Sequence, residues 1–191
     1  MQEFIITLTG TAPLLMHNSR LANPLDPATK ALKKVTGKRT KTDEDHEEMA
    51  RLEHAGSLYF DTDAGPYIPA DNIWRALYDG AKKSKRGPKI KEGIFIQSDV
   101  NPLVYKGPRT IDGLWNDENF RHFASVKVTT SRVMRCRPVF STWTTNAYGL
   151  LDPSVLDLSE LKQIADTSGA LIGLGDWRPR YGRFLATVEK T

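Results

Sequence analysis

Residues 70–85, ADNIWRALYDGAKKSK, have the apolar period of an amphipathic helix. At about 3.6 residues per turn, one helical face carries the apolar side chains of this segment, namely Ile73, Trp74, Leu77, Tyr78 and Ala81. We expect Asp71 to be the N-cap, and the lysines at the other end to interact favourably with the helix dipole. The segment therefore predicts a helix with one face directed into a core.

Three further segments predict the strands beside this helix. EFIITLTG (3–10) is β-branched and apolar and predicts a central strand, whereas RFLATVEK (183–190) predicts the last strand. Residues 126–151 are rich in Val, Thr and aromatic residues and predict two long strands that meet near Arg137-Pro138. Between these strands and the last one, DLSELKQIADTSG (157–169) predicts a second helix.

The order of these elements is strand, helix, strand, strand, helix, strand. This order predicts an α+β, ferredoxin-like (RRM-like) fold, in which a four-stranded antiparallel sheet carries two helices on one face. The chain has 191 residues and its linkers are short, so we expect a single domain over 1–191.

Two segments are expected to be insertions in this core. Residues 26–56 predict a helical insertion of two surface helices, in which Asp26 caps the first helix and Thr42 caps the second. Residues 99–125 combine short strand candidates with turn signals. They predict a thumb-like projection between the first core helix and the long strand pair.

Positive charge is gathered in three places along the chain. The net charge is only +4, but cations cluster at 82–91 (KKSKRGPKIK), 132–137 (RVMRCR) and 178–183 (RPRYGR). If the fold brings these clusters together, they favour a polyanionic partner. The alternative is that each cluster is simply a solvated surface.

The composition also argues against several classes of protein. A single cysteine, Cys136, excludes an internal disulfide framework, makes a zinc site improbable and is typical of a reducing cytoplasm. No apolar run approaches the ~20 residues that span a bilayer. The sequence MQEFIITLTG at the start has no basic segment followed by a cleavage site. We therefore expect a cytoplasmic location, no membrane association, no metal and no cofactor.

The stretch ALIGLGDWRPRYGRF (170–184) combines permissive backbone with cations and rings. Glycine lets backbone N–H groups approach a phosphate closely. Arginines contact phosphates through charge-assisted bonds, and Trp or Tyr rings stack bases. Single-stranded nucleic acid is bound by this combination. The alternative is structural: the glycines turn a helix into a strand, Trp177 fills the core and Asp176 pairs with an arginine.

Two motifs resemble one known family. GPYIPADNIWRALYDGAKK (65–83) resembles the signature that opens the first helix of the repeat-associated mysterious proteins (RAMPs) of CRISPR systems, although Ala70-Asp71-Asn72 stands where that family has Gly-Ser-Ser. GLGDWRPRYGRF (173–184) is similar to the C-terminal glycine-rich loop of the same superfamily. Within it, the likeness is to the guide-RNA-binding backbone subunits, with a free-standing or phage-borne relative as another reading.

The resemblance implies that the chain binds single-stranded RNA or DNA and assembles side by side with copies of itself or related subunits. The residues that we expect to bind the strand lie in the three basic clusters and the glycine-rich loop. They are Arg75, Lys82, Lys83, Lys85, Arg86, Arg132, Arg135, Arg137, Gly173, Gly175, Trp177, Arg178, Arg180, Tyr181, Gly182 and Arg183.

We expect binding without catalysis, and two alternatives stay open. Some members of the superfamily cut RNA, and Asp26 and His17 are the candidates for an aspartate in the loop after the first strand and for a general base. A metal-independent endoribonuclease is therefore the first alternative. A phage-encoded module that mimics a backbone subunit and binds only protein is the second.

Overall fold

The computed structural model describes residues 1–128 and 130–191. Contacts within the chain divide it into two compact units. Unit 1 comprises 1–14, 60–106 and 141–191, and unit 2 comprises 15–59 and 107–140. The segment expected as a helical insertion, 26–56, lies wholly in unit 2, whereas the expected thumb-like segment, 99–125, is divided between the two units.

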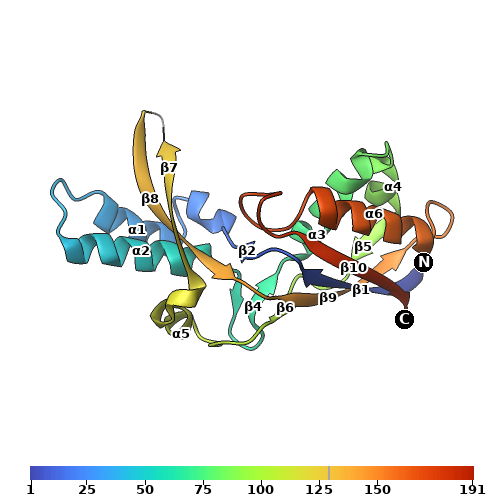
Figure 1. The fold of residues 1–191 in the computed structure, drawn as a ribbon, viewed down its shortest axis with the longest axis horizontal. Helices are drawn as coiled ribbons and strands as arrows, with labels where there is room; N and C mark the ends of the chain where they lie inside the picture. Colours follow the sequence, from blue (N-terminus) through green and yellow to red (C-terminus); the bar gives the residue numbers. More distant parts are fainter. Residues whose placement is uncertain (129) are drawn as a thin grey trace. The chain divides into compact units, whose positions relative to one another are not determined.

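Unit 1, all of whose residues are described, contains a mostly antiparallel sheet (Figure 1). Its neighbouring strands follow the order β10-β1-β9-β6-β4-β3, and β5 also pairs with β9. The strands are β1 (Gln2–Gly10), β3 (Phe60–Asp61), β4 (Gly65–Ile68), β5 (Ile94–Ile96), β6 (Asn101–Val104), β9 (Thr144–Leu151) and β10 (Phe184–Lys190). The α+β class is thus confirmed, and β1 is central as expected. The sheet has more strands than the four predicted.

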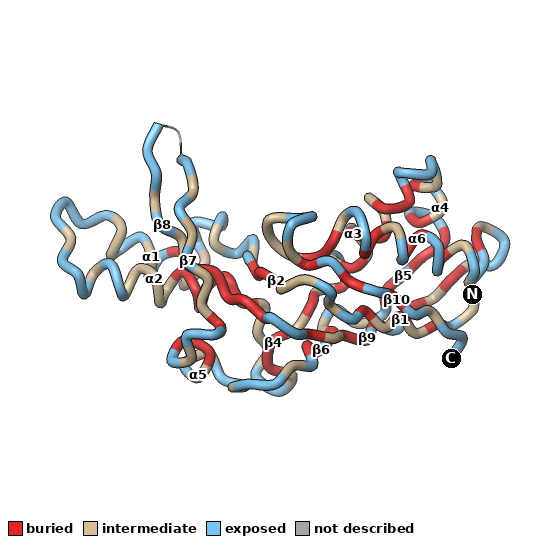
Figure 2. Tube along the Cα trace, viewed as in Figure 1, coloured by how far each residue is buried: buried red, intermediate tan, exposed pale blue. Residues whose placement is uncertain are grey.

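The helices of unit 1 are α3 (Ala70–Lys82), α4 (Gly87–Gly93) and α6 (Leu158–Leu171). α6 packs on β10 and on α3, and α3 packs on β5. On β1, alternate side chains enter the core: Phe4, Ile6 and Leu8 are buried. Figure 2 shows the same alternation of buried and exposed segments along the strands of this unit. The sheet and helix pair therefore enclose one apolar layer.

The predicted cap of α3 is wrong. The helix begins two residues earlier, with Pro69 in the N-cap position and no side-chain hydrogen bond there. Asp71 lies instead in the first turn, where the positive end of the helix dipole favours a carboxylate. The helix itself and its apolar face, including buried Ile73 and Leu77, are confirmed.

In unit 2, two helices lie side by side (Figure 1). α1 (Pro27–Thr36) is capped by Asp26, whose side chain accepts the N–H of Ala28 at 2.8 Å. α2 (Asp43–Ser57) begins with a capping box in which Thr42 and Asp45 exchange hydrogen bonds. Both predicted helices are therefore confirmed, with the predicted caps.

The remainder of unit 2 is a hairpin with short flanking elements. β7 (Arg121–Val128) pairs antiparallel with β8 (Ser131–Phe140). The short elements are η1 (Ser19–Ala22), α5 (Ile111–Asn116) and η2 (Glu118–Phe120). A further short strand, β2 (Leu14–Leu15), comes directly before Met16, and the N–H of Met16 donates to Pro138 O at 3.1 Å. β8 is exposed over its first residues and buried over its last five (Figure 2).

The predicted pair of long strands meeting near Arg137-Pro138 is wrong. Both residues lie within β8, opposite His122 and Arg121 of β7. The chain turns at 141–143 instead, and β9 pairs with β1 in unit 1. The partner of β8 is therefore a segment that the sequence had suggested to be part of the insertion.

Candidate nucleic-acid interface

The glycine-rich stretch forms a closed turn between α6 and β10, which we call the terminal turn (Gly173–Arg183). Gly173 has φ +76° and its N–H donates to Ser168 O at 2.8 Å, which ends α6. Gly182 has φ +70°; its carbonyl accepts the N–H of Leu174 at 2.8 Å, and its own N–H donates to Pro13 O at 2.8 Å. A Cβ on Gly182 would overlap the Leu174 carbonyl. These glycines are therefore required by the backbone of the turn.

Three arginines of the terminal turn, Arg178, Arg180 and Arg183, are exposed. None of them forms an ion pair with a carboxylate in the described part of the chain. Arg183 instead donates from Nε to Pro179 O at 2.8 Å, and the Arg180 guanidinium lies 5.6 Å from the ring centroid of Tyr181. Their positive charges are therefore available to a ligand.

Two rings lie among these arginines. Trp177 and Tyr181 are both half-buried, with ring centroids 6.1 Å apart and planes inclined at 56°. The alternative was that Trp177 fills the core. Trp177 is only half-buried, so it does not fill the core. A shallow hollow of about 520 Å³ lies beside the turn and is lined by Asp176, Trp177 and Arg178, among other residues.

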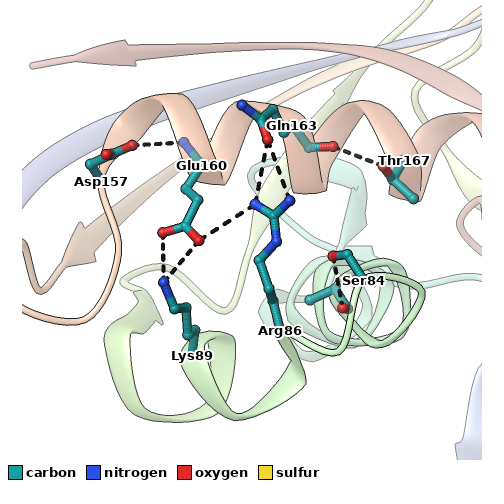
Figure 3. A network of polar contacts seen from close by, with 8 residues as sticks. Ser84, Arg86, Lys89, Asp157, Glu160, Gln163 and Thr167 are labelled. Atoms are coloured by element: carbon teal, nitrogen blue, oxygen red, sulfur yellow. Dashed lines mark hydrogen bonds and ion pairs between the residues drawn. The ribbon is translucent and has the colours of Figure 1, made fainter.

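Two cations at the start of α4, Arg86 and Lys89, are bonded to α6 (Figure 3). Arg86 Nη1 lies 3.4 Å from Glu160 Oε1 and 3.4 Å from Gln163 Oε1, and Lys89 Nζ lies 2.8 Å from the same Glu160 oxygen. This network joins the α3–α4 corner to α6. We therefore assign Arg86 a structural role rather than the predicted contact with nucleic acid.

The cations bonded to Glu160 lie at the other end of α6 from the terminal turn. Glu160 lies in the first turn of α6, and the terminal turn follows the last residue, Leu171; about 16 Å of helix separates the two. The two clusters therefore lie at opposite ends of α6. Of the other cations here, Arg75 and Lys82 both pair with Asp79, at 2.9 Å and 3.8 Å. All of these cations are exposed, as are Lys83 and Lys85.

The arginines of β8 belong to unit 2. Arg137 is buried and its Nη1 lies 2.8 Å from Glu53 Oε1; Arg135 Nη1 lies 3.2 Å from the same oxygen. The second Glu53 oxygen accepts the N–H of Cys136 at 2.9 Å. Both arginines thus link α2 to β8, and Arg132 alone of the three predicted residues on this strand is exposed. Glu53, which the sequence analysis did not single out, organises the cluster.

The two residues considered for catalysis differ in their surroundings. Burial alone would raise the pKa of Asp26, but the N–H of Ala28 and the Arg20 guanidinium hold that pKa below its usual value. Its carboxylate is therefore an ionised helix cap. His17 is exposed, with Nδ1 3.5 Å from Ser57 Oγ, and it lines a pocket of unit 2 together with Arg135.

No protein-family model and no curated protein matches this sequence. Among residues 1–128 and 130–191, no group of three His, Cys, Asp or Glu side chains is arranged to hold a metal ion. The described helices also include none with the length and apolar character needed to cross a bilayer.

Proposed function

We propose that this protein binds single-stranded nucleic acid, RNA in the first instance, through the terminal turn and without cleaving it. One observation carries the proposal: Arg178, Arg180 and Arg183 are exposed and lack ion-pair partners among the described residues, on a turn that also holds two half-buried rings. Unpaired arginines at a surface cost the fold nothing, but they attract phosphates strongly.

The chemistry of the turn suits a strand whose bases are unpaired. Each guanidinium offers several N–H donors to a phosphate, and Trp177 and Tyr181 each offer a ring face on which a base can stack, worth about 1–3 kcal/mol per base. The hydrogen bonds from Leu174 N–H to Gly182 O and from Gly182 N–H to Pro13 O hold the turn before a ligand arrives, so little ordering is needed on binding. Contacts of this kind discriminate weakly between base sequences.

The strand order around β1 supports a ferredoxin-like core as part of this proposal. In chain order, β1, α3, β5, β9, α6 and β10 follow the β-α-β-β-α-β pattern of that fold, and β10, β1, β9 and β5 are neighbours in the sheet. Strands β6, β4 and β3 extend the sheet beyond this core. The proposed relationship to RAMP proteins would put the terminal turn in the slot of their glycine-rich loop.

Binding is tested by fluorescence anisotropy with labelled single-stranded RNA, single-stranded DNA and duplex of equal length, in EDTA. We expect affinity for single strands over duplex, falling as salt rises from about 50 to about 200 mM, with a slope of log K against log salt of about −0.7 per phosphate contacted. No affinity for any of the three would contradict the proposal and favour the protein-binding alternative. Cleavage of the RNA that is lost in His17→Ala would favour the nuclease alternative.

Assembly along the strand is the second part of the proposal, and it follows from the family likeness. Light scattering on the purified protein before and after nuclease treatment tests it. We expect a mass above one chain that falls to one chain after the nucleic acid is removed. A complex that holds only one chain on a long strand, with protein in excess, would contradict side-by-side assembly and leave binding intact.

A further inference from the structure

Unit 2 contains a polar pocket of about 440 Å³ between α1 and β8. Its walls include His17, Lys33 of α1, and Arg135 and Arg137 of β8, with Glu53 of α2 between the two arginines. All of its lining residues belong to unit 2, whereas the terminal turn belongs to unit 1.

The charges that line the pocket are unbalanced. Three permanent cations, Lys33, Arg135 and Arg137, stand against a single carboxylate, Glu53. Both Glu53 oxygens already accept N–H donors, and Lys33 is exposed with no ion pair in the described ranges. An anion that enters the pocket therefore meets a surplus of positive charge.

The net positive charge of the whole chain also lies in unit 2. Unit 2 holds 14 Lys and Arg residues and 10 Asp and Glu residues, a net +4, whereas unit 1 holds 13 of each and is neutral. Long-range attraction of an anion is therefore directed to unit 2. The terminal turn acts through three local arginines on a neutral unit.

An apolar groove of about 590 Å³ adjoins the polar pocket, and the two share Leu32, Glu53 and Arg135. This groove is also lined by Phe123 and Met134, whose exposed fractions are 49% and 61%. A ring and a thioether of this exposure offer a flat, adaptable apolar surface. Charge for an anion and apolar surface for a ring thus lie next to each other.

We propose that unit 2 binds a nucleoside phosphate, with the phosphate in the polar pocket and the base on Phe123 and Met134. Lys33 Nζ contributes charge at the pocket rim. The Nε and Nη2 groups of Arg135 donate to no described group, so they provide directed donors for the phosphate. The nucleoside phosphate is either a free mononucleotide or one unit of a single strand, since both present the same groups.

Isothermal titration of the full chain with uridine monophosphate, inorganic phosphate and a short single-stranded RNA tests the inference. The decisive variant is Lys33→Glu, and its control is Lys34→Glu, an exposed neighbour on α1 that does not line the pocket. We expect at least about a tenfold loss of mononucleotide affinity in Lys33→Glu and no more than about twofold in Lys34→Glu. Equal losses in both variants would overturn the inference, as would a parent protein that binds neither the mononucleotide nor the RNA.

A second variant separates the base from the phosphate. Met134→Ser removes apolar surface at the exposed part of β8, so we expect it to weaken mononucleotide binding and to leave inorganic phosphate binding unchanged. Weakening of both, or of neither, would contradict the proposed orientation. If the parent binds RNA but not the mononucleotide, and Lys33→Glu weakens the binding of RNA, the site is assigned to a strand.

This inference and the proposed function fail separately. Arg178→Glu with Arg180→Glu removes charge from the terminal turn only, so mononucleotide binding in unit 2 should persist in that variant. Loss of mononucleotide binding there would contradict an independent site. Retention of strand binding by the terminal turn in Lys33→Glu would in turn leave the proposed function intact.

Discussion

Arg137 Nη1 lies 2.8 Å from Glu53 Oε1, and this buried pair joins β8 to α2 inside unit 2. Both side chains are 9% exposed, and Arg135 and the N–H of Cys136 bond to the same carboxylate. The carboxylate therefore neutralises part of a buried positive charge and accepts a backbone N–H at the same time. Removing it would leave an uncompensated charge and an unpaired backbone donor in the core.

Glu53→Gln should accordingly lower the free energy of unfolding by about 3–5 kcal/mol, because an amide leaves the two guanidinium groups without their counter-charge. Urea unfolding of the full chain measures the change. Glu47→Gln, an exposed carboxylate on the same helix, is the matched control and should change the free energy by less than about 0.5 kcal/mol. Equal effects of the two substitutions would mean that the Glu53 cluster adds nothing to stability.

The buried thiol beside this cluster makes stability depend on alkaline pH. Burial, and secondarily the Glu53 carboxylate, raise the pKa of Cys136 to about 12. The folded state therefore keeps the thiol protonated between pH about 8.5 and about 12, while the unfolded chain ionises above about 8.5. Since the folded pKa is the higher one, this contribution to stability is complete below pH about 8.5 and is lost as the pH rises.

The parent should thus lose stability with rising pH faster than Cys136→Ala, by about 1.4 kcal/mol per pH unit above pH about 9. Urea unfolding between pH about 8 and about 10.5 gives the free energy of unfolding of each protein. Groups other than Cys136 that titrate in this range affect both proteins alike, so their effects cancel in the difference. A difference that stays flat across this range would contradict a raised pKa. The native thiol should also react with a thiol reagent only after unfolding.

The Arg86 network predicts a variant that affects stability without affecting binding. Glu160 and Arg86 are partly exposed, with side-chain exposures of 23% and 29%, so Arg86→Ala should cost about 1 kcal/mol. Strand affinity should stay within about twofold of the parent, because α6 separates this network from the terminal turn. A large loss of affinity with unchanged unfolding would restore Arg86 to the binding surface. Lys85→Ala, an exposed neighbour, should change neither quantity.

Local signals in the sequence were enough for the helices and the terminal turn. Asp26 and Thr42 cap their helices because a side chain bonds to an N–H only two or three residues away, and such signals need no knowledge of the rest of the fold. Gly173 and Gly182 were likewise recognisable, because the positive φ that they adopt is a property of a short turn.

The partners of β8 could not be read locally. Its apolar and β-branched pattern predicted a strand, but the pattern does not say that residues 121–128 pair with it or that Pro138 lies inside it. Glu53 was hidden for the same reason: it is one carboxylate in an acidic helix until β8, far along the chain, brings two arginines to it. Arg135 and Arg137, which were predicted as strand contacts, are thus both ion-paired with Glu53.

The central claim is that the arginines of the terminal turn hold a single strand. The most direct measurement is the affinity for single-stranded RNA of Arg178→Glu/Arg180→Glu against that of Lys91→Glu/Lys162→Glu, which alters net charge equally at two exposed lysines of unit 1 outside the turn. With both proteins folded by circular dichroism, we predict a loss of at least about a hundredfold in the arginine variant and less than about threefold in the lysine variant. Equal losses in the two proteins, or an unchanged affinity in the arginine variant, would contradict the account.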